Sequence, residues 1–155
     1  MTASTFREVE KGPTFEIYQG PLCVQRLDWT RDGAVRSIYV GHIGVECAEH
    51  IFRRWEALVR AKQRITMLHD AWETTGYESG FRVDLTKWTQ KNPSAIGAVH
   101  MVTRSKLVNM AVSVVSLALP GLVTGYSKRS DFDLLAKKLG LPLNPPIPQG
   151  FAPAT

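Results

Sequence analysis

The chain has 155 residues, of which 44% are hydrophobic and 21% charged, and these values are typical of one folded domain with its own core. A net charge of +5 does not identify a polyanionic partner, because solubility alone accounts for such a surplus. Cys23 and Cys47 have no CxxC spacing, and the N-terminus carries charges where a signal peptide has an apolar run, so we expect a cytoplasmic protein with reduced thiols.

The first part of the chain is predicted to form antiparallel sheet. Residues 1–12 are polar and non-periodic, which predicts an N-terminal tail. Residues 15–29 and 35–43 are rich in β-branched and aromatic residues. Between them, Asp32-Gly33 accepts the positive φ angles that a tight turn needs. We expect two or three antiparallel strands here.

The middle of the chain changes to helical spacing. Glu46–Lys62 has apolar residues three and four apart, which predicts an amphipathic helix. A short strand is predicted at 64–68. A second helix is expected to begin near Ser79 and to end at Asn92-Pro93, because the residue before a proline avoids the helical conformation.

The last part alternates strands and helices. The pattern predicts a buried strand at 98–103, an almost wholly apolar helix at 106–119, a strand at 122–126 and a final helix from Ser130 that Gly140 ends. A helix this apolar must be buried on nearly all sides. Its apolar run is at the short limit for crossing a bilayer and contains polar residues, so no transmembrane segment is predicted.

This order of elements predicts one α/β domain over residues 13–140. Helices that alternate with strands imply parallel crossovers, so we expect a mixed β-sheet with an antiparallel start and about four helices packed mainly on one face. Residues 141–155 hold many prolines and are predicted to be a C-terminal tail.

The element order, the loop and helix start at Glu78-Ser79-Gly80, and the strand–helix unit AVHMVTRSKLVNMAVSVVSLAL (98–119) together resemble the STAS superfamily. That superfamily includes the bacterial anti-sigma-factor antagonists and the cytoplasmic ends of sulfate transporters. More narrowly, the chain is similar to a divergent and mostly uncharacterised bacterial branch. The resemblance spans roughly Phe15 to Leu139 and implies a STAS-like fold.

The resemblance also implies a function. Antagonist-type members are not enzymes; they bind a kinase or an anti-sigma factor and are switched by phosphorylation of a serine that opens a helix. The matching residue here is Ser79, although only the Ser-Gly half of the family's Asp-Ser-Ser-Gly motif is present, and Asp70 would stand for the strand-end aspartate. Serine is also a preferred helix N-cap, so phosphorylation and capping both remain open for Ser79.

A partner-binding surface is predicted at strand ends and helix starts. The stretch from His69 to Glu78 is expected to be an exposed loop, whose tryptophan and tyrosine either anchor a partner or fold back on the domain. The basic turn at 104–106 precedes a helix, where an anion could bind or a serine could cap the helix. The candidate partner-binding residues are Trp72, Glu73, Tyr77, Glu78, Arg104, Ser105 and Lys106.

The sequence contains no motif for catalysis, a metal or a cofactor. The four histidines form neither an HxH nor an HExxH pair, and the serine of Gly76-Tyr-Glu-Ser79-Gly80 is one place too late for a GxSxG elbow. No phosphate-binding or dinucleotide-binding glycine loop is present. Acidic residues interrupt the basic charge at 53–64, which argues against nucleic-acid binding. We therefore expect a protein that is not an enzyme.

The function predicted from the sequence is that of a non-catalytic protein–protein interaction or regulatory module. Two alternatives stay open. The Pro-rich tail could tie copies of the chain into a homo-oligomer or a larger assembly, or a pocket under the unit at 98–119 could bind a lipid or another small apolar ligand, since related folds carry such cavities.

Overall fold

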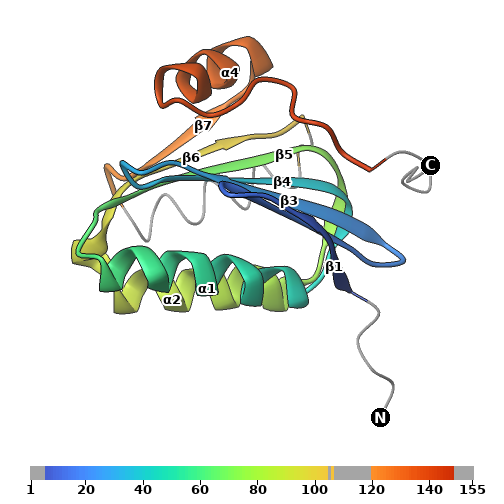
Figure 1. The fold of residues 1–155 in the computed structure, drawn as a ribbon, viewed down its shortest axis with the longest axis horizontal. Coiled ribbons are helices and arrows are strands. Elements are labelled where there is room, and N and C mark those ends of the chain that lie inside the picture. The colour runs from blue at the N-terminus through green and yellow to red at the C-terminus, as the bar shows by residue number, and fades with distance from the viewer. Residues whose placement is uncertain (1–5, 105, 107–119, 149–155) are drawn as a thin grey trace.

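A computed structural model describes residues 6–104, 106 and 120–148, which form a layered α/β structure (Figure 1). Its sheet has seven strands that lie side by side in chain order. The strands are β1 (Arg7–Lys11), β2 (Phe15–Gln19), β3 (Cys23–Trp29), β4 (Ala34–Ile43), β5 (Ile65–Tyr77), β6 (Ile96–Val102) and β7 (Val123–Tyr126). The helices are α1 (Glu46–Arg60), α2 (Ser79–Lys91) and α4 (Arg129–Lys138), and Pro93–Ala95 forms a 3-10 turn.

The antiparallel part of the sheet comprises β1 to β4, four strands where two or three were predicted. The additional strand, β1, lies within the predicted N-terminal tail. Four of its five residues are charged, which is typical of an edge strand, and all five are exposed. The predicted turn between β3 and β4 is confirmed, and Gly33 adopts a φ of +90° there.

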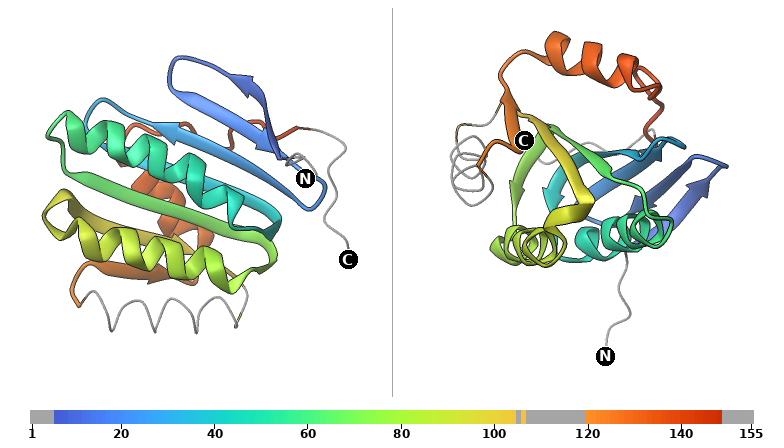
Figure 2. Two further views of the ribbon diagram at one scale, coloured as in Figure 1. Left: turned by 90° about the horizontal axis from the view of Figure 1, so that it is seen from below. Right: turned by 90° about the vertical axis from the view of Figure 1, so that its left-hand side faces the viewer.

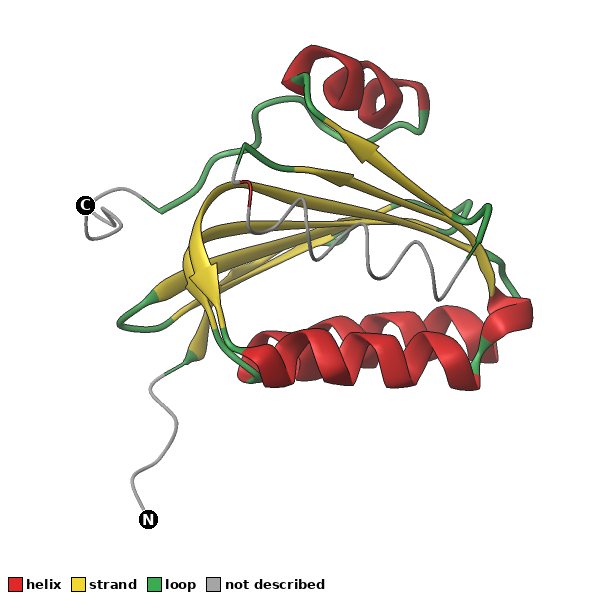
Figure 3. Ribbon diagram, turned by 180° about the vertical axis from the view of Figure 1, so that it is seen from behind, coloured by secondary structure: helices red, strands yellow, loops and turns green. Residues whose placement is uncertain are grey.

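The parallel part of the sheet comprises β4 to β7, so the predicted mixed sheet is confirmed. α1 connects β4 to β5, and α2 connects β5 to β6. Right-handed crossovers between successive neighbours place their helices on the same face. Figure 2 shows α1 and α2 side by side on that face, and Figure 3 shows α4 on the opposite one.

Three α-helices are described where about four were predicted. The predicted helix at 106–119 lies outside the described residues, apart from Lys106. Within the described part of the chain, no helix is long and apolar enough to span a membrane.

The larger core lies between the sheet and the pair α1–α2. The amphipathic pattern of α1 is confirmed, since it buries Cys47, Ala48, Ile51 and Trp55 against the sheet. Trp55 also contacts Trp88 of α2, with ring centroids 5.0 Å apart. These two tryptophans are therefore core residues.

The predicted loop from His69 to Glu78 is wrong for all but its last residue, because β5 continues to Tyr77. β5 pairs with β4 along its length and with β6 over residues 65–70, and its polar residues His69, Asp70 and Thr74 are buried. Their polarity suggests a loop when the sequence is considered alone. In the fold, each of these side chains lies on a covered face of the sheet.

A second core lies between the other face of the sheet and α4. Phe132 and Ala136 of α4 are buried there against Leu68 and Val102. Leu141, in the predicted C-terminal tail, joins this core with 4% exposure. Arg26 of β3 also donates a hydrogen bond to the carbonyl oxygen of Pro146 at 3.0 Å. The domain therefore includes residues beyond the predicted boundary at 140.

Candidate functional site

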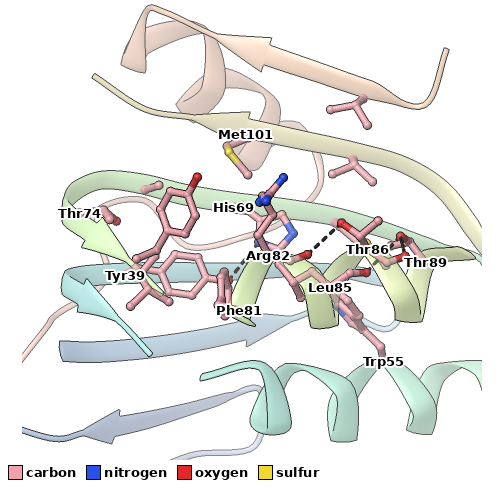
Figure 4. A pocket seen from close by; sticks show the side chains of 16 residues that line it. Tyr39, Trp55, His69, Thr74, Phe81, Arg82, Leu85, Thr86, Thr89 and Met101 are labelled. Atoms are coloured by element: carbon pink, nitrogen blue, oxygen red, sulfur yellow. Dashed lines mark hydrogen bonds between the residues drawn. The ribbon is translucent and has the colours of Figure 1, made fainter. Parts of the chain in front are cut away.

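A cavity of about 90 Å³ lies between α2 and the sheet, on the face that α1 and α2 cover (Figure 4). Side chains from β4 to β7, α1 and α2 line it, and most of them are apolar or aromatic. The apolar wall includes Trp55, Phe81, Leu85, Val99 and Met101. A small apolar pocket with a few polar groups is the usual form of a ligand site.

Two irregularities in β5 bring polar side chains to this cavity. Met67, His69 and Ala71 line it by simple alternation along the strand. The pairing of β4 with β5 then shifts twice, and each shift adds one residue to β5. Each bulge reverses the alternation, so Thr74 and Tyr77 line the same cavity although they are three residues apart.

His69 is a buried polar residue of the cavity lining. Its Nδ1 is 3.1 Å from the hydroxyl oxygen of Tyr39 on β4, and both side chains are buried. Burial lowers the pKa of His69 to about 4 and raises the pKa of Tyr39 well above 10. Both side chains are therefore uncharged at neutral pH. No described residue hydrogen-bonds Nε2 of His69, so that nitrogen can serve a ligand.

Other polar side chains also line the cavity. The hydroxyl of Thr74 is buried and has no hydrogen-bond partner among the described residues. Arg82, in the first half of α2, is a partly buried residue of the lining. The hydroxyls of Thr86 and Thr89 instead donate to carbonyl oxygens of their own helix, at 2.9 Å and 3.1 Å (Figure 4). The cavity therefore combines apolar walls with few hydrogen-bonding groups.

The predicted partner-binding residues do not form one surface. Trp72 packs on the α4 side of the sheet, where the guanidinium carbons of Arg104 and Arg129 lie 5.9 and 6.0 Å from its ring centroid. Glu73 pairs with Arg104 at 3.0 Å nearby. Tyr77 lines the cavity on the opposite face. The two aromatic residues therefore fold back on the domain.

The remaining predicted residues are at helix starts. Glu78, not Ser79, occupies the N-cap position of α2, so the predicted capping role of Ser79 is wrong. Glu78 accepts a hydrogen bond from the backbone N–H of Val45 at 3.3 Å. Ser79 and Lys106 are exposed, whereas Ser105 lies outside the described residues.

Sequence reasoning missed most of the cavity residues. Tyr39 and Arg82 carry no motif, and His69 and Thr74 were assigned to a loop. The alternation of side chains along β5 could have linked His69 to Met67, but the two bulges that bring Thr74 and Tyr77 to the cavity have no local sequence signal. Among the described residues, no group of three or more His, Cys, Asp or Glu could hold a metal ion.

The four antiparallel strands, the parallel crossovers covered by α1 and α2, and α4 on the other face define the SpoIIAA-like, or STAS, fold. The chain is similar to an uncharacterised protein of the DUF3478 family with a SpoIIAA-like fold from Shewanella loihica PV-4. The match has a TM-score of 0.54 and 19% sequence identity, and it covers 70% of this chain and 89% of the other. It confirms the predicted fold. No family model matches the chain, and no curated protein matches it.

Proposed function

We propose that this protein is a non-catalytic binding protein that holds a small, largely apolar ligand in the cavity between α2 and the sheet. The observation that carries the proposal is an apolar cavity lined by the buried His69, whose Nε2 has no hydrogen-bond partner among the described residues. Buried polar groups are nearly always hydrogen-bonded in folded proteins, so such a group calls for a bound molecule.

The size of the cavity supports the same proposal. Protein interiors are normally close-packed, and voids larger than a water molecule are few. At about 24 cal/mol per Å³, leaving a cavity of about 90 Å³ unfilled costs at most about 2 kcal/mol. This is a large fraction of the stability of a small domain. Binding of a ligand would offset that loss.

The polar groups of the cavity suit binding better than catalysis. A general base works best with a pKa near the operating pH, and that of His69 is about 4. The described residues of the lining include neither a cysteine nor a serine, and the hydroxyls of Thr86 and Thr89 donate to backbone carbonyl groups. The unpartnered groups are hydrogen-bonding groups for a ligand.

Two substitutions on α2 test the proposal. Thr86→Phe places a ring in the cavity, whereas Val83→Phe adds the same ring at an exposed position of the same helix. Isobutanol, a small neutral probe, is titrated against each protein while amide resonances are followed by NMR. We expect the resonances of cavity residues to shift in the wild type and in Val83→Phe, but not in Thr86→Phe. Absence of any shift in the wild type would refute the proposal.

A partner protein on the α4 side is the second candidate function. Trp72 is half-buried between two guanidinium groups, and the exposed pair Glu73–Arg104 flanks it, with side chains 51% and 58% exposed. An aromatic residue with a polar rim is typical of interface hot spots. A partner captured by the wild type should be lost with Trp72→Ala. Retention of every partner by this variant would exclude the surface.

Regulation by phosphorylation of Ser79 remains a proposal that the exposure of this residue supports. A phosphate in the first turn of α2 would be favoured by the helix dipole, although Glu78 next to it is acidic. Ser79→Asp mimics part of that charge. We expect it to change the set of captured partners, and phosphosite mapping of protein from its source cell checks whether the residue is modified.

Assembly through the C-terminal tail, the structural alternative, loses part of its basis because residues 141–148 contact the chain's own domain through Leu141 and Pro146. Size-exclusion chromatography of the full chain against a chain that ends at Pro148 tests the remaining residues. A smaller apparent mass for the shortened protein would support assembly.

A further inference from the structure

We infer that the cavity selects a small monocarboxylate, whose carboxylate group is bound by Arg82 and whose alkyl group enters the space between α2 and the sheet. The inference rests on the proposed function and names the chemical class of its ligand. It depends on three observations: the missing counter-ion of Arg82, the charge of the cavity lining and the size of the cavity.

Arg82 differs from the other arginines that are at least partly buried. Each of those other four contacts a carboxylate: Arg26 and Arg36 contact Asp28 at 2.9 and 3.1 Å, Arg54 contacts Glu16 at 3.0 Å, and Arg129 contacts Asp70 at 2.6 Å. Arg82 contacts no carboxylate among the described residues. The segments outside the described residues contain no Asp or Glu in their sequence.

The acidic residue closest to Arg82 on the N-terminal side of its helix is Glu78, four positions earlier. Its carboxylate instead accepts a hydrogen bond from the backbone N–H of Val45. A partly buried guanidinium without a counter-ion is unfavourable, because the charge loses hydration and gains no partner. A bound anion would supply that partner.

The lining of the cavity favours an anion over a cation. Of the described residues that line it, none is acidic, and Arg82 is the one permanent charge. Figure 4 shows Arg82 reaching from α2 toward the sheet residues of the same cavity, beside Met101. A guanidinium can donate two parallel hydrogen bonds to a carboxylate, which is stronger and more directional than a contact with a neutral group.

The volume of the cavity limits the size of the ligand's alkyl group. An apolar cavity of about 150 Å³ can hold benzene, which has six carbons, so a cavity of about 90 Å³ suits a smaller apolar group. An alkyl group of three or four carbons fills such a space and would contact Leu85, Val99 and Met101. Isovalerate, a carboxylate that carries an isobutyl group, is therefore the appropriate probe.

The test compares isovalerate with isovaleramide, its neutral analogue of similar shape, in titrations of the full chain followed by NMR. We expect isovalerate to bind at least tenfold more tightly than the amide. Arg82→Gln should weaken isovalerate at least tenfold and leave the amide unchanged, and Arg82→Lys should weaken isovalerate less. Arg60→Gln removes an exposed charge from α1 and is the charge-matched control, which should bind both probes as the wild type does.

The outcomes separate this inference from the proposed function. Equal binding of the two probes, or unchanged isovalerate binding in Arg82→Gln, overturns the carboxylate inference while the cavity remains a ligand site. Failure of both probes and of isobutanol to bind the wild type overturns the proposed function as well. A melting temperature measured for each variant confirms that it is folded.

Discussion

Asp70 on β5 accepts two hydrogen bonds from the guanidinium of Arg129 on α4, at 3.0 and 2.6 Å. The preceding residue of the strand, His69, contacts Tyr39 on the opposite face of the sheet. Two successive residues of one strand therefore have different roles. Asp70 holds α4 on one face of the sheet, and His69 lines the cavity on the other face.

The first prediction concerns that ion pair. The carboxylate of Asp70 is 4% exposed, so Arg129→Met leaves a buried charge without its partner. We expect the free energy of unfolding to fall by about 2 to 4 kcal/mol, measured by urea denaturation. Arg104→Met is the control, because Arg104 and Glu73 are both more than half exposed, and it should lower the value by less than about 1 kcal/mol. Equal losses would contradict the structural role of the pair.

The second prediction concerns the unpartnered hydroxyl of Thr74. Thr74→Val keeps the shape of the side chain and removes a buried polar group that lacks a partner. We expect the ligand-free protein to become more stable by about 1 kcal/mol. Thr89→Val, at a position whose hydroxyl donates to Leu85, should give no such gain. A loss of stability in Thr74→Val would show that the hydroxyl has a partner in solution.

The third prediction concerns acid stability. The pKa of His69 is about 4 in the folded protein and 6.5 as a free side chain. Between these values the unfolded state binds the additional proton, so stability falls as the pH falls from about 6.5 to about 4. We expect His69→Gln to lose about 2 kcal/mol less than the wild type between pH 7 and pH 4.5. His50, whose pKa is also lowered to about 4, keeps part of the dependence in both proteins. Identical losses would contradict the burial of a neutral His69.

The fourth prediction compares two glycines with positive φ. Gly33 has a φ of +90°, and a Cβ at that position would overlap the carbonyl oxygen of Arg64. Gly140 has a φ of +83° but open space around it. We expect Gly140→Ala to destabilise the protein by about 1 kcal/mol and Gly33→Ala by about 3 kcal/mol, as measured by thermal unfolding. Similar losses would mean that the turn relaxes away from Arg64.

Local signals in the sequence predicted the elements well where the pattern was regular. The spacing of apolar residues in α1 and the Asp32-Gly33 turn are interactions over a few residues, and both were found in the structure. The start of α2 and its end before Pro93 were also found. The order of the elements, together with the helix start at Glu78-Ser79-Gly80 and the unit at 98–119, suggested the STAS-like fold.

The candidate site was far less predictable. Tyr77 and Trp72 were expected on one surface, but they lie on opposite faces of the sheet. Asp70 was expected at an exposed strand end, but it is buried under α4. Polar residues inside a paired strand have the composition of a loop, and nothing local distinguishes the two.

The sequence by itself determined the three described α-helices, the turn at Asp32-Gly33 and the alternation of strands with crossovers, because hydrophobic periodicity and turn chemistry act over a few neighbouring residues. Only the tertiary structure decided that bulges in β5 bring Thr74 and Tyr77 to the same cavity as His69, and that α2 adds Arg82 without a carboxylate partner among the described residues. These contacts join residues far apart in the chain. They depend on strand register and on which face a helix covers, and both are set by packing of the whole domain.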